Sequence, residues 1–539
     1  DRLAGAVAYG WPFCKIPLAG VTPIGQMLKI RKQAGEWEDA EKPARGRRWQ
    51  TLRRRMGRFG SAVAGTGQVD YEDRLMNLML PPTSHGRGPS VRTPDLPGRV
   101  TELLPARRGS MSPLPVPLMV GGSGPGPSTP YLSALQKGGF RVVQSSRDSS
   151  ASDGSPPTVK PGMPIGALYV TGDMTMAGMG TATLVKNDTV LAFGHSMNTE
   201  GKVDVPCAIG QAITVVPSLD NSFRMTMPTE IVGSITQDRT NGIMARLGQK
   251  SDMFPCTVEV RGFARQTYEF RIAHYWRMTP LLTTSAISSS ISRLEGEGSP
   301  YTVKAEATIE LKDREKPLRL RNTYAQLSPG RSVVELVGLP LEMLMFNPHR
   351  KVRIEKVTYS LKLERGYSRA TIQSVRAASR EVQPGGTLNL FVRLKKFQGG
   401  TATRRLGIQV PHDARPGTSV KITVCDAGRS LTLRRKADPG FFSPRDFGML
   451  VDKIQMMPPN TGIYVHAAFR RRGVRYDGAA MPDLPPSALR TLRYGGRVGR
   501  GQPLQQTVRK RASTPWVVQG SQQVEVAVVE PGETGKHRY

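Results

Sequence analysis

A histidine at the end of a glycine-rich segment and an aspartate in a later turn are the residues whose types and spacing could do chemistry. His195 ends the segment 178–195, whose pattern predicts two short strands around a turn, followed by Gly-His. Asp238 lies in the segment 233–243, whose pattern predicts a strand, a polar turn and then Gly-Ile. A histidine can take a proton from a nucleophile, and a carboxylate can fix the histidine's tautomer. From the residues alone, the favoured interpretation of His195 is a packed strand-end histidine, and that of Asp238 is the cap of a loop.

Other polar residues have weaker patterns. Ser155 and Ser299 each lie in Gly-Ser-Pro, where we expect turns, and Asp204 is a second acidic candidate for which we expect a structural role. Cys207 and Cys256 fall in one β-rich region, where they could pair; we expect unpaired buried thiols. No Cys/His cluster has the spacing of zinc ligands, and no glycine motif for a phosphate or dinucleotide is present. We therefore expect no metal and no cofactor, and we expect the other histidines, His274 and His466 among them, to be isolated.

The two segments around His195 and Asp238 resemble the SpoIVB-type serine peptidase family, over about residues 163–262. In that family a glycine-rich hairpin ends in Gly-His, and the second segment follows it. The resemblance implies a trypsin-like β-barrel, peptide-bond hydrolysis through an acyl-enzyme, and His195 as the general base. It also implies a protein or peptide substrate and a place in the cell envelope or outside the cell.

The first residues extend the resemblance. Residues 3–10 are similar to the strand that follows the family's Met-Ser-Gly-Ser-Pro nucleophile elbow, and that string is absent from residues 1–539. We therefore expect the nucleophilic serine and the family's triad aspartate to lie before residue 1, so that this chain alone is inactive. The alternative is a non-catalytic envelope scaffold or binding protein that keeps a peptidase-derived fold.

The chain is strongly basic: 76 Lys and Arg against 43 Asp and Glu give a net charge of +33. Such a charge favours polyanionic partners, but the basic runs are short, for example at 45–48 and 470–472. No zinc-finger spacing, RNP motif or basic zipper accompanies them, so we do not expect specific nucleic-acid binding. An envelope polymer or a protein partner is the expectation that remains. No apolar run is long enough for a transmembrane helix.

Several kinds of element must position these residues, and the pattern predicts a mostly β chain with few helices. Short alternating strands between glycine turns indicate barrels and sandwiches rather than helical bundles. We expect the following regions: 1–33, the end of the nucleophile-bearing half; 34–160, an Arg/Pro/Gly-rich insertion and linker with a short ordered segment near 131–144; 161–272, the His-bearing β-barrel; 273–365, a helix and strands; 366–437, a β-sandwich module; and 438–539, a helix–strand segment with a basic, turn-rich tail.

Overall fold

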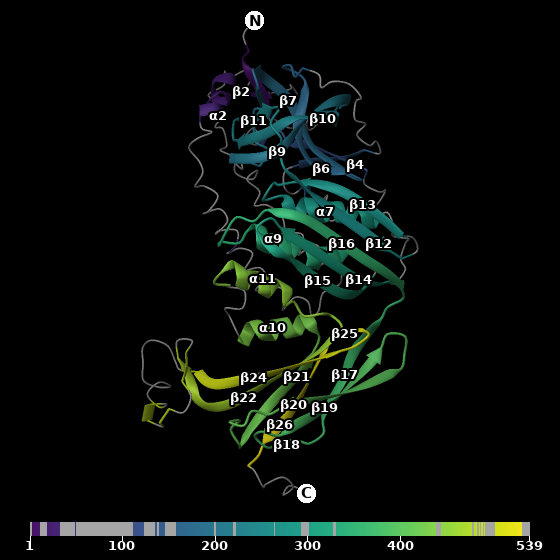
Figure 1. Ribbon diagram of the computed structural model, residues 1–539, viewed down its shortest axis with the longest axis vertical. Coiled ribbons are helices and arrows are strands. Elements are labelled where there is room, and N and C mark those ends of the chain that lie inside the picture. The colour runs from purple at the N-terminus through teal and green to yellow at the C-terminus, as the bar shows by residue number, and fades with distance from the viewer. Residues whose placement is uncertain are drawn as a thin grey trace, which may run out of the picture.

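The computed structural model shows a mostly β, elongated molecule (Figure 1). It describes residues 3–10, 19–32, 112–122, 140–145, 158–198, 201–218, 222–262, 265–292, 301–326, 330–437, 444–476, 479–481 and 502–530, with a few isolated positions besides. A region of strands at the N-terminal end is followed by a sheet covered by helices, and a β-sandwich forms the other end. The few helices agree with the expectation from sequence.

Six antiparallel strands form a closed ring that contains both candidate segments. Strand β6 pairs with β7 and also with β9, and the pairs β7–β8, β8–β11, β11–β10 and β10–β9 complete the circuit. Because each strand of the ring has two neighbours, the ring leaves no open edge. The strands are β6 (Pro164–Gly172), β7 (Thr175–Lys186), β8 (Thr189–Ala192), β9 (Gly201–Val216), β10 (Phe223–Arg239) and β11 (Gly242–Leu247).

The ring closes at Gly166, where three strands lie side by side. Gly166 of β6 is paired with Met179 of β7 on one side and with Ala208 of β9 on the other. A Cβ atom at this position would lie 2.0 Å from the carbonyl oxygen of Gly178. The closure of the ring therefore requires glycine at this position, because backbone, unlike a flexible side chain, cannot move aside.

The N-terminal residues form a small sheet beside the ring. Strand β1 (Gly5–Gly10) pairs with β2 (Ala19–Pro23) and with β3 (Ser112–Pro113), and the short helices α1 (Ile24–Met27) and α2 (Lys29–Lys32) follow. Met27 and Ile30 are buried against Leu191 and Met244 of the ring. Apolar side chains of α1 and α2 thus fasten the N-terminal residues to the strands that carry the candidate segments.

Part of the region expected as an insertion belongs to the sheet. Strand β4 (Val116–Gly121) pairs with β7, and β5 (Phe140–Ser145) pairs in parallel with β4. The expectation of one ordered segment near 131–144 was therefore too narrow, since β4 is also ordered. Most other residues of 34–160 lie outside the described residues. The apolar run of β4 is buried on both faces, so it lacks the alternation that marks a half-exposed strand.

A second set of strands continues from the ring; we call these five strands the central sheet. Strand β13 (Arg265–Ala273) pairs with β6, and the sheet continues through β12 (Met253–Arg261), β16 (Ile354–Arg365), β14 (Tyr301–Leu311) and β15 (Arg314–Gln326). Helices α7 (Thr279–Ser292), α8 (Gly330–Val333), η3 (Val334–Gly338) and α9 (Leu339–Met345) cover one face (Figure 1). The helix expected within 273–365 is present as α7, whereas the helices between 330 and 345 were missed.

Helix α7 is buried on all sides although it is rich in Ser and Thr. The hydroxyl of Thr283 donates to the carbonyl of Thr279, and that of Thr284 donates to the carbonyl of Pro280. These backbone acceptors within the helix satisfy the hydroxyls, so the two threonines enter the core without an unpaired polar group.

The C-terminal sandwich is built from two sheets with a shared core. One sheet has β17 (Arg369–Ala377), β19 (Thr387–Lys396), β20 (Thr401–Gln409) and β25 (Val517–Gln519). The other has β18 (Glu381–Val382), β21 (Thr418–Cys425), β22 (Gly462–Tyr476), β23 (Ala479–Met481), β24 (Gln502–Ser513) and β26 (Ser521–Val528). Leu390, Ile422, Val465 and Val526 are among the side chains of this core.

The sandwich therefore extends well past the boundary expected at residue 437. Its strands β24, β25 and β26 lie in the segment that we expected to be a turn-rich basic tail. Strand β26 pairs with β21, a contact between residues about a hundred positions apart that no local pattern reveals. Helix α10 (Ala427–Ala437) lies against β22. Helix α11 (Phe447–Gln455), the helix expected within 438–539, packs on β15 and α9. No helix among the described residues is long and apolar enough to cross a membrane.

We expect Gly166→Ala to lower the free energy of unfolding by about 1–3 kcal/mol or more, because the added methyl group meets backbone at the ring closure. The measurement is urea unfolding followed by circular dichroism. Gly25→Ala in α1 is the matched control, since nothing lies within 4 Å of its Cβ position. Equal stability of the two variants would contradict this account of the closure.

Candidate functional site

His195 lies directly after a tight turn that ends the β7–β8 hairpin. Two consecutive residues in this turn have left-handed backbone, Phe193 with φ of 73° and Gly194 with φ of 75°. This conformation is costly for a residue with a bulky side chain such as phenylalanine. Packing supports it, because the Phe193 ring lies where a side chain at Gly180 would be, with ring atoms 2.1–2.8 Å from that Cβ position. The glycines of the hairpin therefore make room for the turn that presents His195.

The N-terminal sheet lies against this turn. A Cβ atom on Gly194 would be 2.7 Å from the Cβ of Ala6 and 3.3 Å from that of Ala8, both in β1. The hydroxyl of Thr22 in β2 donates a 2.6 Å hydrogen bond to the carbonyl of Gly194. The strand of residues 5–10 thus contacts the residue just before His195. Glycine is needed at position 194 both for its positive φ and for this close approach.

The imidazole of His195 is buried, with 8% of the residue exposed. Its Nδ1 lies 2.9 Å from the carbonyl oxygen of Ser196. Because a carbonyl oxygen only accepts hydrogen bonds, Nδ1 must carry the proton in this contact. In the neutral ring the lone pair is then on Nε2, the arrangement of a histidine that acts as a base through Nε2. Ser196, which the sequence did not single out, orients the ring by its main chain.

Asp238 holds the loop that follows His195. One of its carboxylate oxygens accepts the backbone N–H of Met197 and the other accepts that of Asn198, each at 2.8 Å. The carboxyl group is fully buried at the end of β10. The interpretation of Asp238 as a loop cap therefore has direct geometric support. It acts on the loop that positions His195.

Two tyrosines that the sequence did not single out complete this buried network. The Tyr275 hydroxyl lies 3.3 Å from the Asp238 carboxylate, to which it donates, and accepts a hydrogen bond from the side-chain amide of Asn198. The ring of Tyr275 stacks on that of Tyr169, with centroids 5.7 Å apart, and the Tyr169 hydroxyl contacts Met197. Tyr275 comes from the segment after β13, so the central sheet also helps to hold the loop.

The remaining sequence candidates fall in different places. Asp204 accepts a hydrogen bond from the hydroxyl of Ser234, which is a contact between neighbouring strands of the ring. Ser155 and Ser299 lie outside the described residues. Cys207 and Cys256 are buried and unpaired, as predicted, and burial raises the pKa of each thiol to about 12. Among the described residues no group of three His, Cys, Asp or Glu side chains could hold a metal ion.

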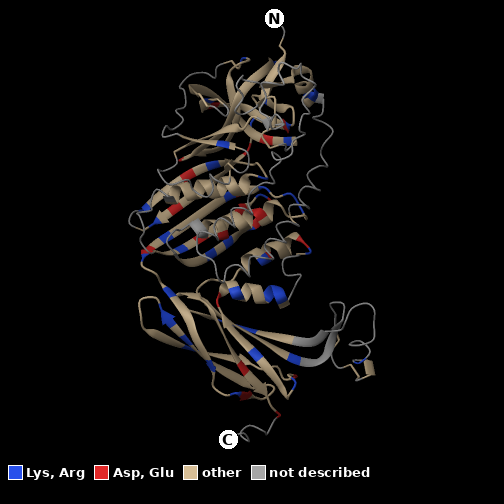
Figure 2. Ribbon diagram, turned by 180° about the vertical axis from the view of Figure 1, so that it is seen from behind, with Lys and Arg blue, Asp and Glu red and all other residues tan. Residues whose placement is uncertain are grey.

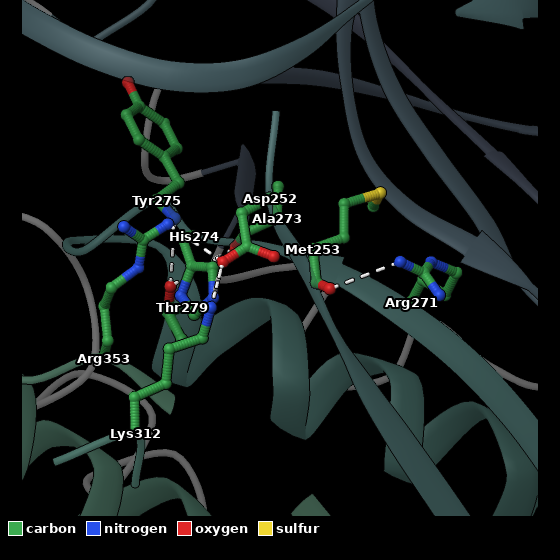
Figure 3. Close-up of polar contacts among 9 residues, drawn as sticks. All are labelled: Asp252, Met253, Arg271, Ala273, His274, Tyr275, Thr279, Lys312 and Arg353. Atoms are coloured by element: carbon green, nitrogen blue, oxygen red, sulfur yellow. Dashed lines mark hydrogen bonds and ion pairs between the residues drawn. The ribbon is translucent and has the colours of Figure 1, made fainter. Parts of the chain in front are cut away.

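A second charged cluster surrounds His274, which the sequence analysis treated as isolated (Figure 3). The carboxylate of Asp252 accepts hydrogen bonds from Lys312 at 2.6 Å and from Arg353 at 3.0 Å. The Nε2 of His274 lies 3.7 Å from the same carboxylate oxygen. Burial lowers the pKa of His274 to about 4, with the two cations adding to the effect and Asp252 opposing it. The cluster thus contains a neutral histidine beside a carboxylate that two cations already satisfy.

A third contact joins a serine and a histidine in the sandwich. The hydroxyl of Ser430 in α10 lies 2.8 Å from Nε2 of His466 in β22. A histidine beside a serine can activate the serine hydroxyl as a nucleophile. Ser430, however, is fully buried under its helix. Burial also lowers the pKa of His466 to about 4. Since no substrate can reach Ser430, we interpret this pair as a polar contact that docks α10 on the sheet.

Comparison of the chain with protein-family models, with curated proteins and with solved structures gave no match. The residues of the chain and the geometry around His195 therefore carry the function proposed below.

We expect Asp238→Asn to destabilise the protein by about 2–4 kcal/mol, because an amide cannot accept both buried N–H groups. Urea unfolding monitored by circular dichroism would measure this loss. The same substitution at the exposed Asp188, which pairs with Arg246 across the surface, should have a much smaller effect. If Asp188→Asn were the more damaging change, Asp238 would not be the residue that holds the loop.

We also expect stability to fall as the pH drops from about 6.5 to 4, partly because of His274. The unfolded chain takes up a proton near the ordinary histidine pKa of 6.5, whereas folded His274 resists protonation down to about 4. Its contribution is therefore fully present above 6.5 and declines below it, by on the order of 2 kcal/mol at pH 5. His274→Gln should lose less stability between pH 7 and pH 5 than the wild type, measured by urea unfolding at both values. Parallel losses in the two proteins would refute this assignment.

Proposed function

We propose that this protein is a SpoIVB-like serine peptidase whose general base is His195. The observation that carries the proposal is the contact of β1 with the turn before His195, with Ala6 and Ala8 against Gly194. In the family that the chain resembles, the strand similar to β1 follows the nucleophile elbow. A serine placed just before β1 would thus approach the histidine.

The form of the ring is compatible with the expected trypsin-like barrel. Its strands are antiparallel, and the sixth strand along the chain, β11, lies between the third and the fifth, β8 and β10. Such a barrel places loops at strand ends, where catalytic groups can meet. The loop that follows His195, after β8, meets the Asp238 carboxylate, at the end of β10, at such a place.

The chemistry would use Nε2 of His195. With Nδ1–H donating to the Ser196 carbonyl, Nε2 can take the proton of a serine hydroxyl as its oxygen attacks a peptide carbonyl. The protonated histidine then gives the proton to the leaving amine, and an acyl-enzyme remains. A water molecule, deprotonated by the same nitrogen, then attacks the acyl carbonyl, and the histidine gives this proton to the serine oxygen as the acid product leaves. Asp238 acts as a positioning residue for the loop.

The serine itself would come from a segment before residue 1, because the family's Met-Ser-Gly-Ser-Pro string is absent from residues 1–539. The chain as it stands would then have no triad activity. As part of the proposal, the substrate is a protein or peptide, and the compartment is the cell envelope or the space outside the cell.

A non-catalytic envelope scaffold is the second candidate. The observation that favours it is the burial of His195, of which only 8% is exposed. In that case the ring and the N-terminal sheet would serve as a support for the sandwich and its partner.

The test is labelling with a fluorophosphonate probe, applied to the protein expressed together with the coding sequence upstream of Asp1. We expect labelling of that longer protein and none of the chain that begins at Asp1. His195→Ala should slow labelling by about a hundredfold or more, because general-base catalysis is lost. His412→Ala, an exposed histidine in the sandwich, should label normally. Absence of labelling in the longer protein, or equal labelling of the His195 variant, would favour the scaffold.

A further inference from the structure

A groove of about 490 Å³ lies where the central sheet meets the sandwich. Strands β12, β14, β15 and β16 form one wall, and residues before β22 together with β24 form the other. Asn322 of β15 accepts the backbone N–H of Asn460, and the Asn460 side chain donates to the carbonyl of Thr323. The two walls are thus fastened to each other, so the groove is a built feature of the fold.

Cationic side chains from several strands line this groove: Arg261, Lys304, Arg321, Lys362 and Arg511. They come from β12, β14, β15, β16 and β24, so that only the folded chain gathers them. Figure 2 shows Lys and Arg along the strands of the central sheet, with acidic residues among them, and more basic residues on α10 next to the sandwich.

Three of these cations stand in one row across neighbouring strands. Lys362 is the Cα partner of Arg261 on one side and of Lys304 on the other. Like charges directly opposite each other destabilise a sheet. The fold therefore accepts an electrostatic cost at this place, and an anion that bound across the row would relieve it.

Carboxylates reduce this repulsion only in part. Glu364 accepts hydrogen bonds from Lys304 at 2.8 Å and from Lys362 at 3.1 Å, and these contacts lower its pKa. Glu259 pairs with Arg261 at 3.1 Å. One carboxylate shared by two lysines leaves a positive charge in the row.

The other lining residues indicate the kind of anion. Ser360, Thr323 and Thr461 bring hydroxyl groups to the groove, and Glu306 brings a carboxylate that can accept from a ligand hydroxyl. No aromatic side chain is among the described residues that line it. Proteins that bind single-stranded nucleic acid stack bases on aromatic rings, so these walls suit a ligand with charges and hydroxyls but no bases.

We infer that the groove binds a linear anionic polysaccharide, a role that goes beyond the proposed peptidase function. Neighbouring strands are about 5 Å apart, which is similar to the length of one sugar residue in such a polymer. A chain laid across the strands would place successive carboxylate or sulfate groups over Arg261, Lys362 and Lys304. Its hydroxyls would meet Ser360 and Thr323.

The experiment measures binding of a fluorescein-labelled heparin oligosaccharide to the full chain by fluorescence anisotropy at several salt concentrations. The groove variant is Lys304→Gln with Lys362→Gln, and we expect it to bind about tenfold more weakly or worse. Its salt dependence should also become shallower by about two charges. The matched control replaces two exposed lysines of the sandwich, Lys395→Gln with Lys421→Gln, and should keep its affinity.

A second groove variant tests the same inference in case the first variant fails to fold. Arg321→Gln with Arg511→Gln removes charge from the same groove through β15 and β24, and both arginines are exposed. Circular dichroism would establish that each variant is folded. Equal loss in the groove and control variants, or no heparin binding by the wild type, would overturn the inference. Tighter binding of single-stranded DNA than of heparin, sensitive to the groove variant, would also overturn it.

Discussion

The buried carboxylate of Asp238 is the contact on which the candidate site depends. Two consecutive backbone N–H groups, at Met197 and Asn198, would otherwise lie unpaired in the interior. Both oxygens of the carboxylate are needed, since each accepts one of these groups. The loop then has one conformation, and His195 at its start has one place. The Asp238 carboxylate, which the sequence offered as a possible triad acid, therefore has a structural role: it holds the loop that follows His195.

The geometry around this contact comes from three parts of the chain. The ring supplies the hairpin and Asp238, the N-terminal sheet covers the turn at Gly194, and Tyr275 reaches in from the central sheet. None of these parts positions His195 alone. The tautomer of the ring follows from a main-chain acceptor, the carbonyl of Ser196. If a peptidase site exists here, its base is oriented by the backbone.

Ionisable side chains behave differently in the interior of the molecule and on its surface. Inside, His274 and His466 stay neutral because burial lowers the pKa of each. On the surface, the fold tolerates a row of cations between the central sheet and the sandwich. The net charge of +33 is thus partly gathered at one built groove, where the strands of two regions meet.

The sequence determined the mostly β class, the hairpin before His195, the strand and turn that carry Asp238, and one helix each within 273–365 and 438–539, found as α7 and α11. Alternation, glycine turns and helical periodicity are local signals. The sequence could not show that β26 pairs with β21, that His274 meets Asp252, or that Ser430 meets His466, because these contacts join residues far apart along the chain. The same holds for Asp238, for which the sequence left two interpretations open. Only the tertiary structure decided where its carboxylate lies, since the direction of a side chain at a strand end depends on the neighbours that pack around it.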